Sequence, residues 1–330
     1  IVDSLVGSEM CIRDRNKIVF SGVAKTEEEI ILAIENDILS INIESYGEFE
    51  RILEVSKELN KKVNCALRVN PDIAIGSHKY IQTGSKTSKF GLDKESALKI
   101  SSQCEVDGPI KLTSVASHIG SQISDENLIL ESVDYLIEIA DELAKNGHNI
   151  EYLDIGGGLG IQYRDEEEGS PKILLEKVKE LLSERDFKII LEPGRSVIGT
   201  AGILVSKVEY IKEAGEKKFA IIDAGMNDLI RPSLYEAWHK VIEVNHKNTD
   251  LDLYDLAGPV CETGDVLAKD RNLKIMPGDH VAFMDVGAYG SVMTSNYNSR
   301  LRPIELLVTK DKVQVIKRKE SFEDIVALET

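Results

Sequence analysis

The chain has 330 residues, 42% of them hydrophobic, and its 57 acidic and 40 basic side chains give a formal net charge of −17. This length allows a large buried core and favours two domains. The acidic balance argues against nucleic acid and membrane surfaces as partners, because both select basic proteins. No apolar run is long enough for a membrane span and no signal segment is recognisable, so we expect a cytoplasmic protein.

Residues 1–15 show neither a helical nor a strand period and lead directly into a strand at Ile18. The stretch resembles spurious translated sequence at the ends of reading frames assembled from short reads. We therefore expect residues 1–15 to be a leader that is foreign to the fold. The four cysteines show no paired or CxxC spacing, so neither a disulfide nor a metal site is expected. They are Cys11, Cys65, Cys104 and Cys261.

Between residues 16 and 200, short β-rich runs alternate with longer amphipathic stretches. The expected strands are Ile18–Ser21, Leu39–Glu44, Val63–Val69, Leu112–His118, Tyr152–Ile155 and Lys188–Glu192. The expected helices are Thr26–Asn36, Tyr46–Leu59, Lys94–Gln103, Glu126–Asn146 and Lys172–Glu184. Alternation without hairpin signals predicts a parallel sheet with right-handed crossovers.

Eight such strand-helix units would close a (β/α)8 barrel, and six are visible, so we expect the first two units to be missing. The predicted fold of residues 16–200 is therefore a partial TIM-type barrel. In such barrels the active groups gather at the carboxyl ends of the strands. Asn70, His118 and the segment Glu192–Arg195 each follow a predicted strand in this way.

Residues 201–330 have a different character, because short strands separated by turn signals replace the alternation with helices. The expected strands are Ile203–Ile211, Phe219–Ile222, His239–Val244, Tyr254–Ala257, His280–Met284, Leu306–Thr309 and Val313–Lys317. This pattern predicts an antiparallel β-domain. The fold class is then α/β followed by β.

Two motifs at strand ends predict a cofactor seat. Gly156, Gly157 and Gly158 follow one strand, and residues without a Cβ let backbone N–H groups close on an anion such as a phosphate. Glu192 and Arg195 follow the next strand and offer a carboxylate and a guanidinium. Pyridoxal 5′-phosphate needs both a phosphate cradle and a group that holds its ring nitrogen, so the pair of motifs favours this cofactor.

Further motifs accompany these two: Ser117–Gln122 (SHIGSQ), Asp223–Pro232 (DAGMNDLIRP), Gly258–Asp265 (GPVCETGD) and Gly287–Gly290 (GAYG). With them, the chain resembles the fold-type III pyridoxal phosphate decarboxylases over residues 16–328, and within them the group that acts on diaminopimelate. The resemblance implies an alanine racemase-like TIM-type barrel that carries the cofactor and a β-domain that completes the site. It also implies a homodimer whose active sites are shared at the interface.

The resemblance implies roles for individual residues. His118 would lie against the cofactor ring, and Glu192 would keep the ring nitrogen protonated, because a nearby carboxylate favours the charged form. A protonated ring is the electron sink that decarboxylation requires. The remaining cofactor-binding residues would be Ser121, Gly157, Gly158, Gly194, Arg195 and Tyr289.

By the same resemblance, Cys261 would protonate the reacting carbon after carbon dioxide leaves, with His118 as the other catalytic residue. The substrate would be bound by Arg195, Arg231, Tyr235, Glu262 and Tyr289. Two arginines suit a second carboxylate and are awkward for a purely cationic distal end. The expected reaction is therefore the conversion of meso-diaminopimelate to L-lysine and carbon dioxide, the last step of lysine biosynthesis.

Enzymes of this kind hold the cofactor through a lysine on the first barrel strand, and no lysine of the chain stands in that setting. We therefore expect the chain as given to be inactive and to derive from an incomplete gene. Two alternatives stay open. One is a decarboxylase of ornithine, lysine or a carboxylated polyamine, and the other is a non-catalytic pseudoenzyme that acts by binding.

Overall fold

The computed structural model describes residues 14–74, 88–166, 169–245 and 250–329. These residues form two compact units, the first within 14–160 and 169–193 and the second within 161–166 and 194–329. Apart from residues 14 and 15, the predicted leader 1–15 lies outside the described residues, as does Cys11.

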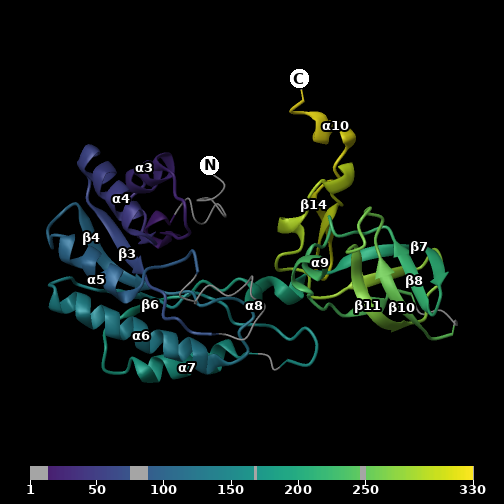
Figure 1. The fold of residues 1–330 in the computed structure, drawn as a ribbon, viewed down its shortest axis with the longest axis horizontal. Coiled ribbons are helices and arrows are strands. Elements are labelled where there is room, and N and C mark those ends of the chain that lie inside the picture. Colours follow the sequence, from purple (N-terminus) through teal and green to yellow (C-terminus); the bar gives the residue numbers. More distant parts are fainter. Residues whose placement is uncertain (1–13, 75–87, 167–168, 246–249, 330) are drawn as a thin grey trace. The chain divides into compact units, whose positions relative to one another are not determined.

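The first unit is built on a six-stranded parallel sheet in the order β1-β2-β3-β4-β5-β6, with five helices of its own (Figure 1). The strands are β1 (Val19–Phe20), β2 (Ser40–Ile43), β3 (Val63–Arg68), β4 (Ile110–Ala116), β5 (Tyr152–Asp154) and β6 (Lys188–Ile190). The helices are α3 (Glu27–Glu35), α4 (Tyr46–Glu58), α5 (Lys94–Gln103), α6 (Glu126–Lys145) and α7 (Pro171–Leu181). Every strand and helix predicted for this region is confirmed, as is the parallel pairing.

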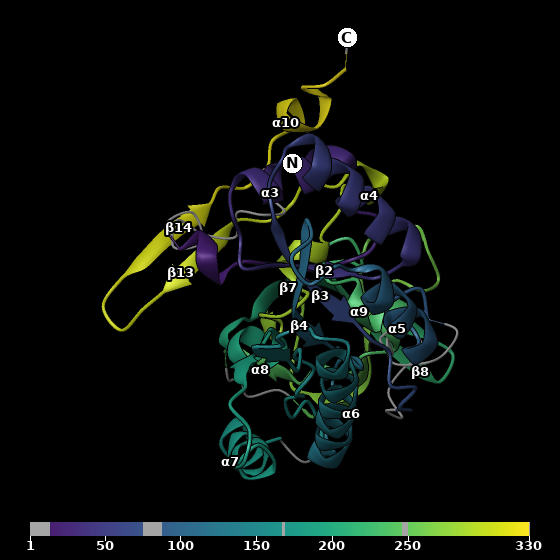
Figure 2. The same cartoon turned by 90° about the vertical axis from the view of Figure 1, so that its left-hand side faces the viewer.

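The helices of this unit begin where the sequence offers a capping side chain. Thr26 and Glu29 form a reciprocal capping box at the start of α3, and Ser45 and Asp93 accept backbone N–H groups at the starts of α4 and α5. Figure 2 shows α4, α5 and α6 following one another around the outside of the strands.

The two faces of the parallel sheet differ in chemistry. Successive side chains of a strand point to opposite faces, and the pairing register aligns Ile41 with Cys65 and Asn42 with Ala66. One face is apolar and packs in the core beneath the helices, with Ile41, Ile43, Cys65, Leu67, Val115 and Leu153. The opposite face carries buried polar side chains, namely Ser40, Asn42, Glu44, Arg68, Ser114 and Asp154. This polar face is the one that leads to the candidate site.

The second unit is a β-domain with short helices. Its main sheet has the order β11-β10-β8-β7-β12-β9, and β13 pairs with β14 in a separate hairpin. The strands are β7 (Leu204–Ala214), β8 (Lys217–Ile222), β9 (Val241–Glu243), β10 (Asp252–Ala257), β11 (Val266–Leu273), β12 (His280–Phe283), β13 (Glu305–Val308) and β14 (Val313–Lys317). The α-helices are α8 (Arg195–Ile198), α9 (Arg231–Tyr235) and α10 (Phe322–Val326).

The β-domain differs from its prediction in two respects. Strands β8 and β10 pair in parallel, whereas an antiparallel domain was expected. Their connection is long and includes α9 and β9, so the chain can return and lie beside β8 in the same direction. Strand β11 was not predicted, because its polar centre Lys269–Asn272 breaks the alternation that marks a strand and Asp270 has a positive φ of 55°.

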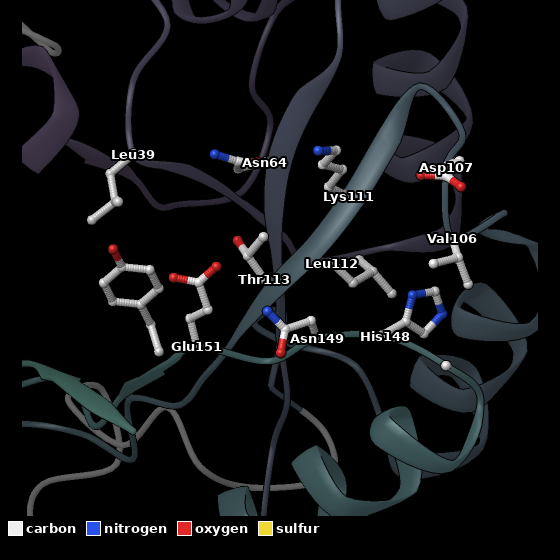
Figure 3. Close-up of a pocket in the computed structure, with 12 residues that line it drawn as sticks. Leu39, Asn64, Val106, Asp107, Lys111, Leu112, Thr113, His148, Asn149 and Glu151 are labelled. Carbon is white, nitrogen blue, oxygen red and sulfur yellow. The ribbon is translucent and has the colours of Figure 1, made fainter. Parts of the chain in front are cut away.

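Two further features of the described residues bear on function. None of their helices combines the length and the apolar character needed to cross a bilayer. A cavity of about 280 Å³ opens at the amino ends of β3, β4 and β5, lined in part by Lys111, His148 and Glu151 (Figure 3). It lies at the opposite end of the strands from the glycine run that follows β5, so it is separate from the candidate site.

Candidate functional site

The glycine run Gly156–Gly158 follows β5 and leaves no room for side chains. A Cβ on Gly157 would lie 2.1 Å from the backbone oxygen of Glu192, and one on Gly156 would lie 2.5 Å from that of Ser117. Gly156 and Gly158 also have positive φ angles of 67° and 101°. Only glycine meets both demands, so the backbone stays bare at this strand end.

The segments around this run form a tight cluster. The Glu192 N–H donates to the carbonyl of Gly156 at 2.8 Å, which places the carboxylate-bearing segment beside the glycines. Gly120 lies close enough that its oxygen would be 2.3 Å from a Cβ on Gly158, and Ser121 follows it directly. The N–H of Gly158 has no acceptor among the described residues. Glycine backbone with an N–H group that has no acceptor within the fold is suited to binding a phosphate.

His118 completes the cluster in a defined protonation state. Its Nδ1 accepts the N–H of Gly157 at 3.2 Å, so the ring proton stands on Nε2. Burial, followed by the Arg68 guanidinium, lowers the pKa of His118 to about 4. The ring is therefore neutral near pH 7. The Gly157 N–H is used by this bond, so the N–H of Gly158 is the better placed of the two to donate to a phosphate.

Two carboxyl groups lie at the same end of the sheet. Burial, and then the nearby Glu192, raises the pKa of Asp154 to about 7. Asp154 accepts the N–H of Gly156 through Oδ1 at 3.0 Å, while its buried Oδ2 has no partner among the described residues. Glu192 remains partly open to solvent, yet desolvation raises its pKa, against the lowering effect of Arg68. A positive charge beside Glu192 would restore its ionised form.

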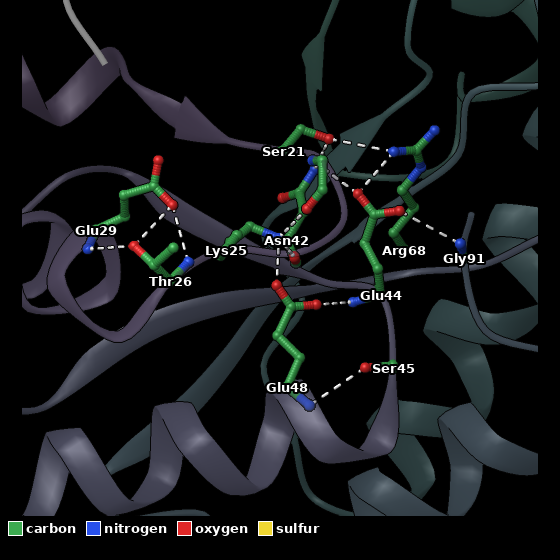
Figure 4. A network of polar contacts seen from close by, with 11 residues as sticks. Ser21, Lys25, Thr26, Glu29, Asn42, Glu44, Ser45, Glu48, Arg68 and Gly91 are labelled. Carbon is green, nitrogen blue, oxygen red and sulfur yellow. Dashed lines mark hydrogen bonds and ion pairs between the residues drawn. The ribbon is translucent and has the colours of Figure 1, made fainter. Parts of the chain in front are cut away.

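Paired charges surround these groups on the polar face of the sheet (Figure 4). Arg68 donates to Glu44 at 2.7 Å, and the same carboxylate accepts the N–H of Gly22 at 2.7 Å. Lys25 is 4% exposed and donates to the carbonyls of Gly22 and Asn42 and to Glu48 at 2.5 Å. All three donors of the Lys25 ammonium are thus used within the fold, so Lys25 has a structural role.

The second unit holds a separate cluster of cationic and aromatic side chains. Arg195, the first residue of α8, donates to the Tyr163 hydroxyl at 2.6 Å. Its guanidinium carbon lies 4.9 Å from the centre of the Tyr289 ring, and Gly194 immediately precedes it. Tyr289 has a positive φ of 57° and is 42% exposed, so its ring reaches solvent beside Arg195.

Arg231 is the second buried arginine of this unit. It begins α9, is 6% exposed and lies with its guanidinium carbon 4.7 Å from the centre of the Tyr163 ring. Its Nη1 lies 2.9 Å from Nε2 of His239. Tyr235 is the last residue of the same short helix. Tyr163 therefore contacts both arginines that the sequence assigned to substrate binding.

Cys261 and Glu262 lie in the loop between β10 and β11, away from the contacts of the two arginines. Both are exposed, and Cys261 is a free thiol. The Tyr297 hydroxyl donates to the Glu262 carboxylate, which raises the pKa of Tyr297. The structure of one chain therefore leaves these two side chains open to solvent.

Some residues of these clusters were not predicted from the sequence. Tyr163 and His239 stand outside the motifs used for the prediction, and Tyr163 contacts Arg231 although 68 residues separate them along the chain. Asp154 belongs to the glycine motif as the last residue of β5, but no role was predicted for its side chain. Nothing in the sequence pattern distinguishes Tyr163 or His239 from an ordinary core residue.

Comparison with known proteins gives a consistent result. The family model described as the pyridoxal binding domain of pyridoxal-dependent decarboxylases matches residues 9–199. The diaminopimelate decarboxylase of Aquifex aeolicus is 44% identical over 312 residues, which are 94% of this chain and 74% of that protein. The diaminopimelate decarboxylase of Haemophilus influenzae is 43% identical over 322 residues, covering 96% of this chain and 77% of the relative.

Solved structures agree with the sequence relatives. The diaminopimelate decarboxylase of Helicobacter pylori, determined in complex with L-lysine, superimposes with a TM-score of 0.91 at 39% identity, covering 96% of this chain and 79% of that one. The diaminopimelate decarboxylase of M. jannaschi superimposes with a TM-score of 0.89 at 39% identity, covering 98% of this chain and 76% of that one.

Proposed function

The chain belongs to the pyridoxal-dependent decarboxylases, and within them to the diaminopimelate decarboxylases, and from this premise we propose how its residues serve the reaction. The reaction is the decarboxylation of meso-diaminopimelate to L-lysine and carbon dioxide. The cofactor is pyridoxal phosphate. When bound, it supplies the electron sink for the charge that departing carbon dioxide leaves behind.

The main support for the proposed cofactor-binding residues is the contact between the glycine run and the Glu192 segment. Gly158 and Ser121 would bind the phosphate through a backbone N–H and a hydroxyl, and the lack of a Cβ on Gly157 lets the Glu192 segment lie directly beside them. Glu192 would accept a hydrogen bond from the protonated ring nitrogen and hold that proton in place. The neutral ring of His118 would pack against the cofactor, its Nδ1 fixed by the Gly157 N–H.

The second unit would bind the substrate and deliver a proton. Arg195 and Arg231 would pair with carboxylates, while Gly194, Tyr235, Tyr289 and Glu262 would contact the cofactor phosphate or the distal end of the substrate. The Cys261 thiol would donate a proton to the reacting carbon after carbon dioxide has left. A decarboxylase of purely cationic amines would leave a buried guanidinium without a partner, which argues for diaminopimelate.

A homodimer with shared active sites is the second part of the proposal, and the cytoplasm is the proposed compartment. Both strands of the β13–β14 hairpin expose large apolar side chains, as interaction surfaces do. They are Leu306, Leu307, Val308, Val313, Val315 and Ile316. Exposed Cys261 and Glu262 are consistent with roles in the site of a second subunit. Sedimentation that gives a monomer at micromolar concentration would contradict this part.

The test of the function uses the protein encoded by the complete reading frame, loaded with pyridoxal phosphate. Carbon dioxide release is measured with meso-diaminopimelate, ornithine and lysine as separate substrates. Release from diaminopimelate alone is expected, and release from ornithine or lysine alone would favour the alternative decarboxylase.

A matched variant tests the role of Glu192. Glu192→Gln keeps the shape and a neutral acceptor but loses the carboxylate, so it should bind the cofactor yet decarboxylate on the order of 100-fold more slowly. Unchanged turnover would remove Glu192 from the proposed mechanism. Mixing Glu192→Gln protein with Cys261→Ala protein should restore part of the activity if the sites are shared between subunits.

A further inference from the structure

The second unit contains a buried guanidinium whose contacts are all neutral. Arg231 is 6% exposed, and burial lowers the pKa of its guanidinium. Its contacts are the imidazole of His239 and the ring face of Tyr163. Among the described residues, no carboxylate pairs with Arg231. A buried cation of this kind is stabilised when an anion pairs with it.

The imidazole beside Arg231 has a defined tautomer. A guanidinium can only donate, so Nε2 of His239 accepts from Arg231 Nη1 at 2.9 Å. A carbonyl can only accept, so Nδ1 of His239 donates to the backbone oxygen of Met284 at 2.9 Å. His239 is 0% exposed, and its two ring nitrogens are both engaged. The ring is therefore neutral, protonated on Nδ1, and held between Met284, which follows β12, and Arg231, the first residue of α9.

The surroundings of His239 also keep its ring neutral. Burial, and then the Arg231 guanidinium, lowers the pKa of His239 to about 4. The ring remains an acceptor at neutral pH. A protonated ring would lose the lone pair that holds Arg231 and would place a second positive charge against it.

Tyr163 provides a second fixed contact. Its ring is 4.7 Å from the Arg231 guanidinium carbon and 5.7 Å from that of Arg195, and its hydroxyl accepts from Arg195 at 2.6 Å. The edge of the same ring packs on His239 at a centroid distance of 5.4 Å. The two guanidinium groups are thus held around one aromatic ring, and among the described residues no carboxylate takes a donor of Arg231.

We propose that His239 is a positioning residue that orients Arg231 toward the carboxylate of the substrate which is not lost in the reaction. This inference rests on the proposed function, in which L-lysine keeps that carboxylate as product. His239 does not touch the ligand. It takes one N–H of Arg231, fixes the plane of the guanidinium, and so presents the other donors as a pair, the geometry that binds a carboxylate.

The test compares L-lysine with cadaverine, which is L-lysine without its carboxylate, as competitive ligands of the cofactor-loaded protein. His239→Asn can still donate to Met284 but is too short to accept from Arg231. His239→Gln is long enough to return an acceptor to Arg231. Circular dichroism melts of the three proteins provide the control for folding.

The expected result is selective. His239→Asn should weaken L-lysine binding and raise the KM for meso-diaminopimelate by about tenfold or more, the usual effect of losing a hydrogen bond to a charged group. Cadaverine binding should stay within about twofold, and kcat should change less than KM. His239→Gln should recover most of the L-lysine affinity. Equal losses for both ligands, or no recovery with His239→Gln, would overturn the proposal and leave His239 a packing residue.

A measurement on the unaltered protein remains decisive if His239→Asn does not fold. Heteronuclear NMR of the histidine ring nitrogens should give His239 a protonated Nδ1 and an acceptor Nε2 at neutral pH. The Nε2 signal should shift on addition of L-lysine and not of cadaverine. A proton on Nε2, or equal shifts with both ligands, would overturn the proposal.

The outcomes also separate this inference from the function itself. If the unsubstituted protein of the complete reading frame releases no carbon dioxide from meso-diaminopimelate, the proposed function fails, whatever the His239 variants do. If it does release carbon dioxide and His239→Asn binds L-lysine normally, only the inference about His239 fails.

Discussion

The two units bury their charges in different ways. In the first unit, Lys25 pairs with Glu48 and Arg68 pairs with Glu44, at 2.5 and 2.7 Å. In the second unit, Arg231 contacts an imidazole and a tyrosine ring, and no carboxylate pairs with it among the described residues. A paired charge leaves the interior neutral without a ligand, whereas an unpaired guanidinium holds a positive charge for an anion. Under the proposed function, what distinguishes the structural charges Lys25 and Arg68 from the binding charge of Arg231 is the carboxylate partner, because all three side chains are buried.

The largest expected effect on stability concerns the buried ion pair between Arg68 and Glu44 in the first unit. Arg68→Met should lower the free energy of unfolding by about 3–5 kcal/mol, because it leaves the Glu44 carboxylate buried without its counter-ion. Arg231→Met is the matched control, since it removes a buried charge whose partners are neutral, and its stability should fall by only about 1–2 kcal/mol, the cost of leaving Nε2 of His239 without its donor. Urea denaturation of both variants measures the difference. Equal losses would break the comparison.

The second expected effect concerns Asp154, a carboxyl group of the first unit whose pKa is raised by burial. Its folded pKa of about 7 exceeds the ordinary value of 3.8. Between these values the folded state holds a proton that the unfolded chain has released, so stability falls as pH rises through the window. Asp154→Asn removes this loss and can still accept the Gly156 N–H through its amide oxygen.

The size of that effect follows from the same linkage. Asp154→Asn should be more stable than the parent by on the order of 4 kcal/mol at about pH 8, and nearly equal to it at about pH 4. Denaturant titrations at the two pH values measure this. A variant less stable than the parent at the higher pH would mean that Asp154 is ionised and stabilised there.

The smallest expected effect concerns an exposed pair. Arg318 and Asp324 form two hydrogen bonds of 2.6 Å at the surface of the second unit. Water and salt screen such a pair, so Arg318→Met should leave the melting temperature within the error of the measurement. A clear drop comparable to that of Arg68→Met would show that burial is not what gives the Arg68 pair its effect.

Much of the first unit follows from its sequence, because local signals and global fold agree there. The strands are apolar runs between capped amphipathic helices, and Thr26, Ser45 and Asp93 mark helix starts without reference to any distant residue. The approach of Glu192 to the glycine run could also be predicted, because neighbouring parallel strands end at the same edge of the sheet.

The second unit was harder to predict, for a physical reason. Strand β11 has a polar centre, so its sequence does not show the alternation typical of a strand. It is recognised as a strand only through its pairing with β10, which includes a bulge. Likewise, the role proposed for His239 depends on Arg231 and on the Met284 carbonyl, which is 45 residues away along the chain. Residues that position another side chain through tertiary contacts do not recur at a fixed spacing in the sequence. A sequence pattern therefore cannot identify them.

The collisions at the glycine run have a consequence for genetics. Each Cβ added there would strike a main-chain oxygen, that of Ser117, Gly120 or Glu192, and every amino acid carries such an oxygen. A substitution at a neighbouring position cannot make space by shortening a side chain. Loss-of-function alleles at Gly156, Gly157 and Gly158 should therefore lack intragenic suppressors at these three contact positions, unlike alleles in the helix-covered core, where a smaller neighbour can compensate.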